Sequence, residues 1–215
     1  MLDSVKSKIV VVGASGHAKV IIDMLEKQGL EEVAFIIDDN PSLKGSFLFD
    51  YPVAGDRSVL LDQARRHDVD RAVVAIGNND IRVEISAWLE SVGFSLVSVV
   101  HPSAQIGRGV MISPGSVIMA GAVVNSDSRI GKNVIVNTGA TVDHDCMISD
   151  GAHIAPGCNV CGGVTIGSRT LIGAGTTIIP NIRVGQHVVV GAGSTLLNDV
   201  PDGAKVAGSP AREIS

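Results

Sequence analysis

The sequence predicts two structural parts, an α/β domain with a mainly parallel sheet followed by an all-β parallel β-helix. In residues 8–99, short apolar segments alternate with segments of helical period, as strands and helices do in an α/β fold. From residue 100 onward the helical signal is lost and a six-residue period replaces it. The chain has 215 residues, 45% of them hydrophobic, which is enough for two cores. We therefore expect an α/β domain at 1–99, a β-helix at 100–200 and a C-terminal tail at 201–215.

In the first part, turn and capping residues separate the elements. The expected strands are residues 9–12, 33–37, 71–76 and 96–100. The expected helices are residues 17–28, which Gly29 ends, residues 58–67, which Ser58 caps, and residues 81–91, which the turn at 77–80 caps. This order predicts a small Rossmann-like domain, whose ligands would bind at the carboxyl ends of the strands.

In the second part, every sixth residue from Ile106 to Leu196 is aliphatic, over sixteen positions without exception. Two residues before each of them stands a small or β-branched residue. Three residues after stands mostly Gly, Asn or Asp, the types that tolerate a left-handed backbone. The pattern predicts short strands with alternate residues inward and tight corners between them, three strands to a coil.

Composition excludes several classes of protein. Only 3% of the residues are aromatic and the net charge is −5, which disfavours a protein that stacks nucleic-acid bases on a basic surface. No apolar run approaches the ~20 residues of a membrane span, and the first residues lack a signal pattern, so we expect a cytoplasmic protein. The three cysteines lack C-x-x-C spacing, which argues against a disulfide framework and against structural zinc. Cys146 and Cys158 fall on inward positions and are expected to pack in the core.

Five segments together resemble one group of enzymes. The hexads and the closing segment at residues 206–212 resemble the left-handed β-helix acyltransferases. The segments at 13–17, 76–79 and 137–145 narrow the resemblance to bacterial nucleotide-sugar 4-amino N-acetyltransferases and the related sialic acid O-acetyltransferases. The resemblance implies a left-handed β-helix and a reaction that needs no metal. It also implies a homotrimer in which acetyl-coenzyme A (acetyl-CoA) lies between neighbouring subunits.

The adjacent residues His144 and Asp145 follow the inward Val142, so they should lie on a corner and point away from the core. A plain solvated turn is the alternative, because Asp127 and Asp199 occupy the repeat position of Asp145. A base that titrates near neutrality and is held in one tautomer by a carboxylate suits proton transfer. The resemblance implies that His144 takes the proton of the attacking amine or hydroxyl and that Asp145 orients its ring.

His153 precedes an inward residue and should point outward, half a coil away from His144. The two histidines cannot readily share a substrate within one chain, so a site that uses both would lie between subunits. By the resemblance, His153 contacts the thioester end of acetyl-CoA and Asn137 positions the reacting groups, although Asn137 could also be a polar strand flank. The resemblance also implies cofactor contacts through the backbone at Gly162, Ala174 and Ala192.

The segment Gly13-Ala-Ser-Gly-His ends a strand and opens a helix, where backbone N–H groups can bind phosphate. It is not the dinucleotide motif, because Ser15 and Ala18 stand where that motif needs glycine. Half of a dinucleotide domain suits a mononucleotide. The residues expected to hold a nucleotide sugar are Gly13, Ser15, Gly16, His17, Asp38, Asp39, Gly77 and Asn78.

The sequence thus predicts an acetyl-CoA-dependent N-acetyltransferase that acts on the 4-amino group of a UDP-, GDP- or dTDP-linked amino-deoxy sugar for surface glycan synthesis. Three alternatives remain open. The first is O-acetylation of sialic acid or a related sugar by the same residues. The second is a zinc carbonic anhydrase, which would need three converging imidazoles. The third is a non-catalytic trimeric scaffold that binds a nucleotide.

Overall fold

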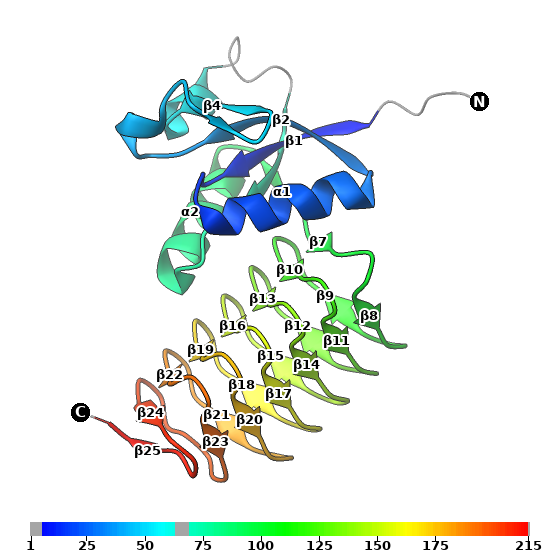
Figure 1. Cartoon of the computed structure of the whole chain (residues 1–215), viewed down its shortest axis with the longest axis vertical. Coiled ribbons are helices and arrows are strands. Elements are labelled where there is room, and N and C mark those ends of the chain that lie inside the picture. The colour runs from blue at the N-terminus through cyan, green and yellow to red at the C-terminus, as the bar shows by residue number, and fades with distance from the viewer. Residues whose placement is uncertain (1–5, 63–68, 215) are drawn as a thin grey trace. The chain divides into compact units, whose positions relative to one another are not determined.

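The computed structural model describes residues 6–62 and 69–214, and the chain forms two compact units, Met1–Val99 and Val100–Ser215 (Figure 1). The first is a Rossmann-like α/β unit and the second is a parallel β-helix, as the sequence predicts. Within the described ranges, neither unit contains a helix long and apolar enough to cross a membrane.

The N-terminal unit contains a six-stranded sheet in the order β3-β4-β2-β1-β5-β6. All neighbouring strands are parallel except β3 and β4. Strand β1 lies inside the sheet because its aliphatic run, Ile9 to Val12, is buried on both faces. The strands are β1 (Ser7–Val12), β2 (Glu31–Ile37), β3 (Phe47–Leu48), β4 (Tyr51–Gly55), β5 (Arg71–Val74) and β6 (Ser95–Leu96).

Two of the three predicted helices form as expected. Helix α1 (Gly16–Gln28) ends at Gly29, whose φ of 67° is the left-handed conformation of a C-cap. Helix α2 (Asn79–Ser91) is capped by Asn78, whose side chain accepts a hydrogen bond from the Ile81 N–H. A short 3₁₀ turn, η1 (Pro41–Leu43), follows β2.

Two predicted elements were wrong. In place of a helix over 58–67, a 3₁₀ helix η2 (Arg57–Leu61) forms, and its cap is Asp56 rather than Ser58, because the Asp56 carboxylate accepts the Ser58 N–H. Asp62 ends this short helix in extended backbone, and residues 63–67 of the predicted helix, His67 among them, lie outside the described residues. The single strand predicted at 96–100 is two strands: β6 pairs with β5, and β7 (Val99–Val100) belongs to a β-helix sheet.

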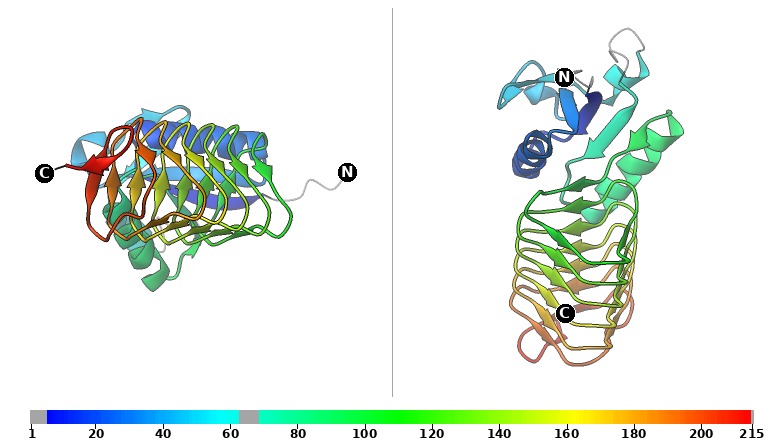
Figure 2. Two further views of the ribbon diagram at one scale, coloured as in Figure 1. Left: turned by 90° about the horizontal axis from the view of Figure 1, so that it is seen from below. Right: turned by 90° about the vertical axis from the view of Figure 1, so that its right-hand side faces the viewer.

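The β-helix has three sheets (Figure 2). From residue 105 to residue 196 the paired strands are parallel and eighteen residues apart, whereas Val189 pairs with Lys205, sixteen residues on, and the last strand is antiparallel. Sheet 1 holds β7, β10 (Val117–Ile118), β13 (Ile135–Val136), β16 (His153–Ile154), β19 (Leu171–Ile172), β22 (Val189–Val190), β24 (Lys205–Ala207) and the antiparallel β25 (Arg212–Glu213). Sheet 2 holds β8 (Gln105–Ile106), β11 (Val123–Val124), β14 (Thr141–Val142), β17 (Asn159–Val160), β20 (Thr177–Ile178) and β23 (Thr195–Leu196). Sheet 3 holds β9 (Met111–Ile112), β12 (Arg129–Ile130), β15 (Met147–Ile148), β18 (Thr165–Ile166) and β21 (Arg183–Val184). The segment that the sequence sets apart as a tail carries β24 and β25 in its described part.

The predicted hexad positions form the core of the β-helix. From Ile118 to Leu196 they are buried, whereas Ile106, in the first coil, is 40% exposed. The small residues two positions earlier are also buried, and polar ones among them are satisfied: the hydroxyls of Ser116 and Thr170 donate to backbone carbonyls. From Gly109 to Gly193 the corner residues adopt the predicted left-handed backbone, even where the residue is Arg169 or His187, whereas Asp199 does not.

Candidate active site

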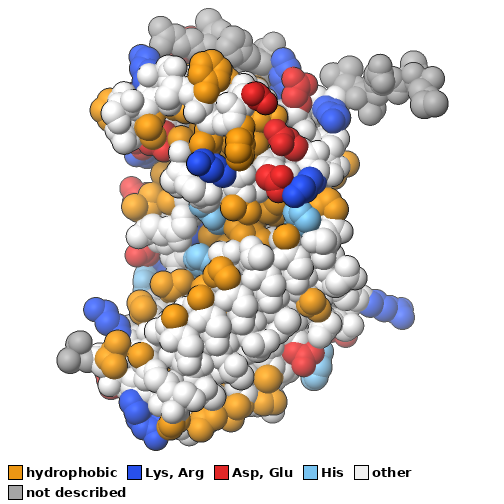
Figure 3. All heavy atoms as spheres, viewed as in Figure 1, with side chains coloured by type: hydrophobic (Ala, Val, Ile, Leu, Met, Phe, Trp, Pro, Cys, Tyr) orange, Lys and Arg blue, Asp and Glu red, His pale blue; other side chains and the backbone are white. Residues whose placement is uncertain are grey.

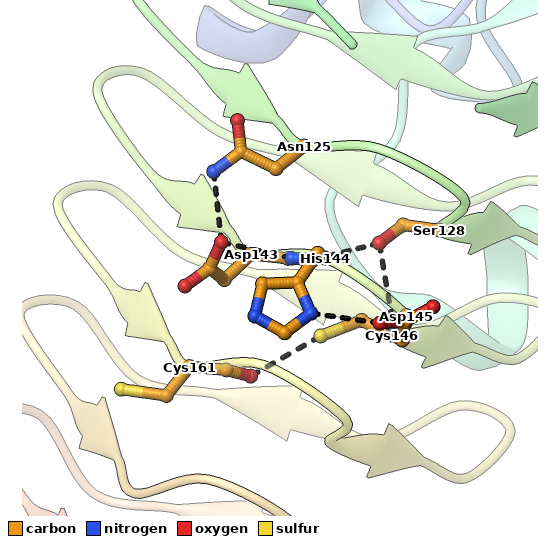
Figure 4. A network of polar contacts seen from close by, with 7 residues as sticks. All are labelled: Asn125, Ser128, Asp143, His144, Asp145, Cys146 and Cys161. Carbon is orange, nitrogen blue, oxygen red and sulfur yellow. Dashed lines mark hydrogen bonds and ion pairs between the residues drawn. The ribbon is translucent and has the colours of Figure 1, made fainter. Parts of the chain in front are cut away.

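His144 and Asp145 lie at the corner between sheets 2 and 3, directly after β14 (Figure 4). The His144 Nδ1 atom is 2.8 Å from Oδ2 of Asp145, and both side chains are more than half exposed. Asp145 occupies the left-handed corner position, with φ 58°. The hydrogen bond to Asp145, followed by the charge of Asp143, raises the pKa of His144 above 6.5. The imidazole is therefore exposed, oriented and more basic than a free histidine.

Gly162 lies one coil below His144, eighteen residues along the chain. A Cβ atom on Gly162 would be 2.7 Å from both Cε1 and Nε2 of His144, far inside van der Waals contact. Since Gly162 does not have a left-handed φ, glycine is needed here for close approach rather than for conformation. The ring of His144 thus lies across the Gly162 backbone, a contact that the sequence does not predict.

Sequence reasoning also missed Asp143 and Asn125. Asp143 Oδ1 accepts hydrogen bonds from Nδ2 of Asn125 and from the backbone N–H of His144, each at 2.9 Å (Figure 4). These two bonds, that of Asn125 first, hold the pKa of Asp143 below its usual range. Asn125 and Asp143 are eighteen residues apart, so counting by the coil period would have placed them side by side.

A second group of predicted residues lies on sheet 1. Asn137 Nδ2 and His153 Nε2 are 3.0 Å apart, and Asn137 Oδ1 accepts the Thr138 N–H. Because an amide nitrogen can only donate, this bond makes Nε2 of His153 the acceptor and leaves the hydrogen on Nδ1. Both side chains are half-buried, so the pair is held more firmly than an exposed contact.

Ala174 and Ala192 occupy the corner that follows sheet 1, one coil apart, and the Gly193 N–H donates to the Ala174 carbonyl. The predicted β-helix residues therefore form two groups on different corners of one chain. Here "corner group" denotes His144, Asp145 and Gly162, and "sheet group" denotes Asn137, His153, Ala174 and Ala192. Figure 3 shows a β-helix face on which backbone and uncharged polar side chains prevail and charged side chains lie at the margins.

In the N-terminal unit, three of the predicted glycines have different roles. Gly13 has φ 109°, and a Cβ there would lie 2.9 Å from the Ala75 carbonyl oxygen, so the fold itself requires glycine. Gly16 and Gly77 have open space around the Cβ position and no left-handed φ. The fold does not explain these two glycines, whereas close approach of a ligand to their backbone would. Ser15 is the N-cap of α1, but its side chain makes no capping hydrogen bond.

The two predicted aspartates after β2 also differ. Both carboxylate oxygens of Asp38 accept backbone N–H groups, of Ala14 at 2.8 Å and of Asn40 at 2.9 Å. Asp38 thus ties the end of β2 to the loop before α1. Asp39 is half exposed and forms an ion pair with Arg57 at 2.9 Å, whose guanidinium lies 5.5 Å from the ring centroid of Trp88. Nothing in the sequence pattern indicates that Arg57 or Trp88 lies here.

His17 is largely buried at the start of α1, and its Nε2 atom has no hydrogen-bond partner among the described residues. Burial first, and the charge of Arg82 second, lower its pKa to about 4. Its imidazole is therefore neutral near pH 7. Throughout the described ranges, no three His, Cys, Asp or Glu side chains are grouped closely enough to hold a metal ion.

Known proteins resemble both units. The PglD N-terminal domain model matches residues 8–89, and the bacterial transferase hexapeptide model (six repeats) matches residues 145–179 and 163–198. PerB from Caulobacter crescentus, solved in complex with CoA and GDP-perosamine, is 38% identical with a TM-score of 0.91, and the match covers 99% of each chain. The acetyltransferase domain of PglB from Neisseria gonorrhoeae, in complex with acetyl coenzyme A, is 37% identical with a TM-score of 0.88, over 97% of this chain and all of that one.

A curated relative, UDP-N-acetylbacillosamine N-acetyltransferase of Bacillus subtilis, is 33% identical over 113 residues. That match covers 52% of this chain and 51% of the relative, so it spans about half the length of each. The two solved structures, by contrast, match nearly end to end, and together with the hexapeptide match and the stacked parallel strands they support a left-handed β-helix in this chain. The chain therefore belongs to the family of hexapeptide-repeat sugar N-acetyltransferases that carry a PglD N-terminal domain.

Proposed function

We propose that this protein transfers the acetyl group of acetyl-CoA to the 4-amino group of a nucleotide-linked amino-deoxy sugar. The observation that carries the proposal is the corner group: an exposed imidazole bonded to a carboxylate at 2.8 Å and seated on a glycine. The relatives named above support the substrate class, since one binds CoA with GDP-perosamine and another is named for UDP-N-acetylbacillosamine.

In the proposed reaction, the sugar nitrogen attacks the thioester carbonyl carbon and forms the new C–N bond. His144 accepts the proton that this nitrogen loses. Asp145 receives a hydrogen bond from Nδ1–H of His144, which leaves the Nε2 lone pair to act as the base. As the tetrahedral intermediate collapses, the C–S bond breaks and CoA leaves as a thiolate that takes up the proton held by the His144 imidazolium, which returns His144 to its neutral form. Asp145 also stabilises the imidazolium that exists between these events.

The separation of the two groups supports a site shared between subunits. The corner group and the sheet group lie on different corners of one β-helix, with His144 and His153 nine residues apart in an eighteen-residue coil. In a homotrimer, the corner group of one subunit would face the sheet group of its neighbour across a cleft. Acetyl-CoA would bind in this cleft, with Asn137 and His153 at its thioester end and the backbone at Gly162, Ala174 and Ala192 along it.

The N-terminal unit would hold the nucleotide diphosphate. The amides at the start of α1, the exposed Ser15 and the open glycines 16 and 77 present donors at the carboxyl end of the sheet. Asp39 would bond the base or the ribose. The proposal uses no metal, places the protein in the cytoplasm, and assigns the product to surface glycan synthesis.

A substrate panel tests the proposal. Purified protein is given acetyl-CoA with UDP-, GDP- or dTDP-linked 4-amino sugars or with free sialic acid, and release of the CoA thiol is followed. We expect release with at least one nucleotide-linked amino sugar and an N-acetyl product by mass spectrometry. Turnover with sialic acid alone would favour the O-acetyltransferase alternative, and no turnover with any acceptor would favour the non-catalytic scaffold.

A further inference from the structure

Arg82, on the first turn of α2, is a fully buried arginine that the proposed reaction does not use; only 1% of its surface is exposed. Burying a guanidinium is costly unless good hydrogen bonds compensate for its lost hydration. Burial lowers the pKa of Arg82 to about 10, so it remains charged near pH 7. A buried charge of this kind is expected where its hydrogen bonds fix the position of neighbouring backbone groups.

Three of the Arg82 hydrogen bonds go to one segment, two to the loop between β5 and α2 and one to Asn79, the first residue of α2. Its Nη1 atom donates to the carbonyls of Ile76 at 3.1 Å and Gly77 at 3.0 Å. Its Nη2 atom donates to the side-chain oxygen of Asn79 at 2.8 Å. The guanidinium therefore fixes two successive peptide groups of this loop.

The orientation of those peptide groups has a consequence for their N–H groups. In a planar trans peptide the N–H points away from the C=O. Since the carbonyls of Ile76 and Gly77 face Arg82, the N–H groups of Gly77 and Asn78 face the other way. Both residues are exposed, and neither N–H has an acceptor among the described residues. The loop thus presents two adjacent donors to solvent.

These donors lie beside the residues at the start of α1 that are proposed above to bind the diphosphate. Strands β1 and β5 are neighbours, and the Ala75 carbonyl packs against Gly13, so the loops that follow the two strands start side by side. The buried Nε2 of His17 has no hydrogen-bond partner among the described residues, and the imidazole is close enough to Arg82 for its charge to lower the pKa of His17. Paired backbone N–H groups bind anionic oxygens well.

We propose that Arg82 is a positioning residue for substrate: it turns the amides of Gly77 and Asn78 outward as a donor pair for the diphosphate of the nucleotide sugar. The inference rests on the proposed function. It assigns Arg82 no direct contact with substrate. It also explains why residue 77 is glycine, because a Cβ in the open space there would block an approaching phosphate oxygen.

Arg82→Met tests the inference, with Arg71→Met as the matched control. Arg71 lies at the opposite end of β5 and pairs with Glu31. Calorimetric titration of the full-length variants with GDP, UDP and dTDP should show dissociation constants about tenfold or more higher for Arg82→Met and about unchanged for Arg71→Met. The KM for the nucleotide sugar should rise equally while the KM for acetyl-CoA stays within about twofold, a split that general destabilisation would not produce.

Two further measurements cover the case in which Arg82→Met does not fold. Gly77→Ala keeps Arg82 and should show the same selective loss of nucleotide binding. Hydrogen exchange of the wild-type protein should slow at residues 77 and 78 when GDP or UDP is added. A folded Arg82→Met that binds nucleotides as wild type does, or unchanged exchange at both amides, overturns the role of Arg82 and leaves the proposed function standing. Failure of the wild-type protein to bind any of the three nucleotides overturns both.

Discussion

His144 lies between two carboxylates that act on it in different ways. Asp145 bonds Nδ1 directly, whereas Asp143 bonds the His144 backbone N–H and is itself held by Asn125. Only Asp145 therefore controls the tautomer of the ring. Asp143 adds negative charge nearby and fixes the backbone of the corner.

Asp145→Asn should lower the pKa of His144 and slow catalysis, because the charge that stabilises the imidazolium is lost. The proposed reaction requires neutral His144, so kcat/KM should rise with pH through the His144 pKa, which in wild type lies above 6.5. In the variant this acidic limb should move to lower pH, and kcat should fall about tenfold or more. The control is Asp127→Asn, which changes an aspartate at the same repeat position, one coil away, with φ 61°. A limb that does not move in Asp145→Asn would show that Asp145 does not act on the base.

At this scale the sequence predicts the residues of the candidate site but not the contacts that hold them. His144, Asp145, Asn137 and His153 are identified from pattern and resemblance. The contact of the His144 ring with Gly162 depends on a side-chain rotamer, which spacing alone does not specify. The two hydrogen bonds that the Asp38 carboxylate accepts, from the Ala14 and Asn40 N–H groups, depend likewise on how the loops after β1 and β2 lie against each other.

At the scale of elements, the coil repeat places Gly162 directly against the ring of His144, the proposed base. Gly162→Ala should displace the His144 ring, because the new Cβ would lie 2.7 Å from two ring atoms. We expect kcat to fall about 10- to 100-fold with little change in melting temperature, since the ring that must move is exposed. Adding Gly162→Ala to His144→Ala should cause no further loss in kcat. A further loss, or full activity in the single variant, would contradict this account of Gly162.

The β-helix core should be most sensitive in its inner coils. Ile154→Ala removes a side chain with 0% exposure and should lower the free energy of unfolding by about 2–5 kcal/mol. Ile106→Ala changes the same hexad position where the side chain is 40% exposed, and should cost less than about 1 kcal/mol. Urea unfolding of both variants, followed by circular dichroism, compares them. Equal losses would mean that the hexad period, rather than burial, sets the contribution of each residue.

The sequence predicts strands correctly where the six-residue pattern repeats, and its predictions are wrong or missing where no pattern repeats. The hexads predict the strands of sheets 1 to 3 and their left-handed corners because each coil repeats the same signal. The hairpin β3–β4 was not predicted, since its strands are short and Pro52 interrupts one of them. The strand predicted at 96–100 failed because an apolar run does not indicate which sheet its residues join.

At the scale of the whole molecule, a site shared between subunits predicts complementation. His144→Ala lacks the proposed base and His153→Ala lacks the proposed thioester contact, so each alone should be nearly inactive. In mixed trimers refolded from equal amounts, about a quarter of the sites should combine an intact corner group with an intact sheet group. Activity recovered toward that fraction supports the shared site. Mixtures no more active than either variant alone would contradict it.

The central claim is that His144 is the base for acetyl transfer to a nucleotide-linked amino sugar. The most direct test is single-turnover acetyl transfer by His144→Ala at saturating acetyl-CoA and sugar, compared with wild type. The account predicts a rate lower by about 10²- to 10⁴-fold, the contribution of a general base, with nucleotide binding unchanged. A variant that transfers acetyl at the wild-type rate would contradict it.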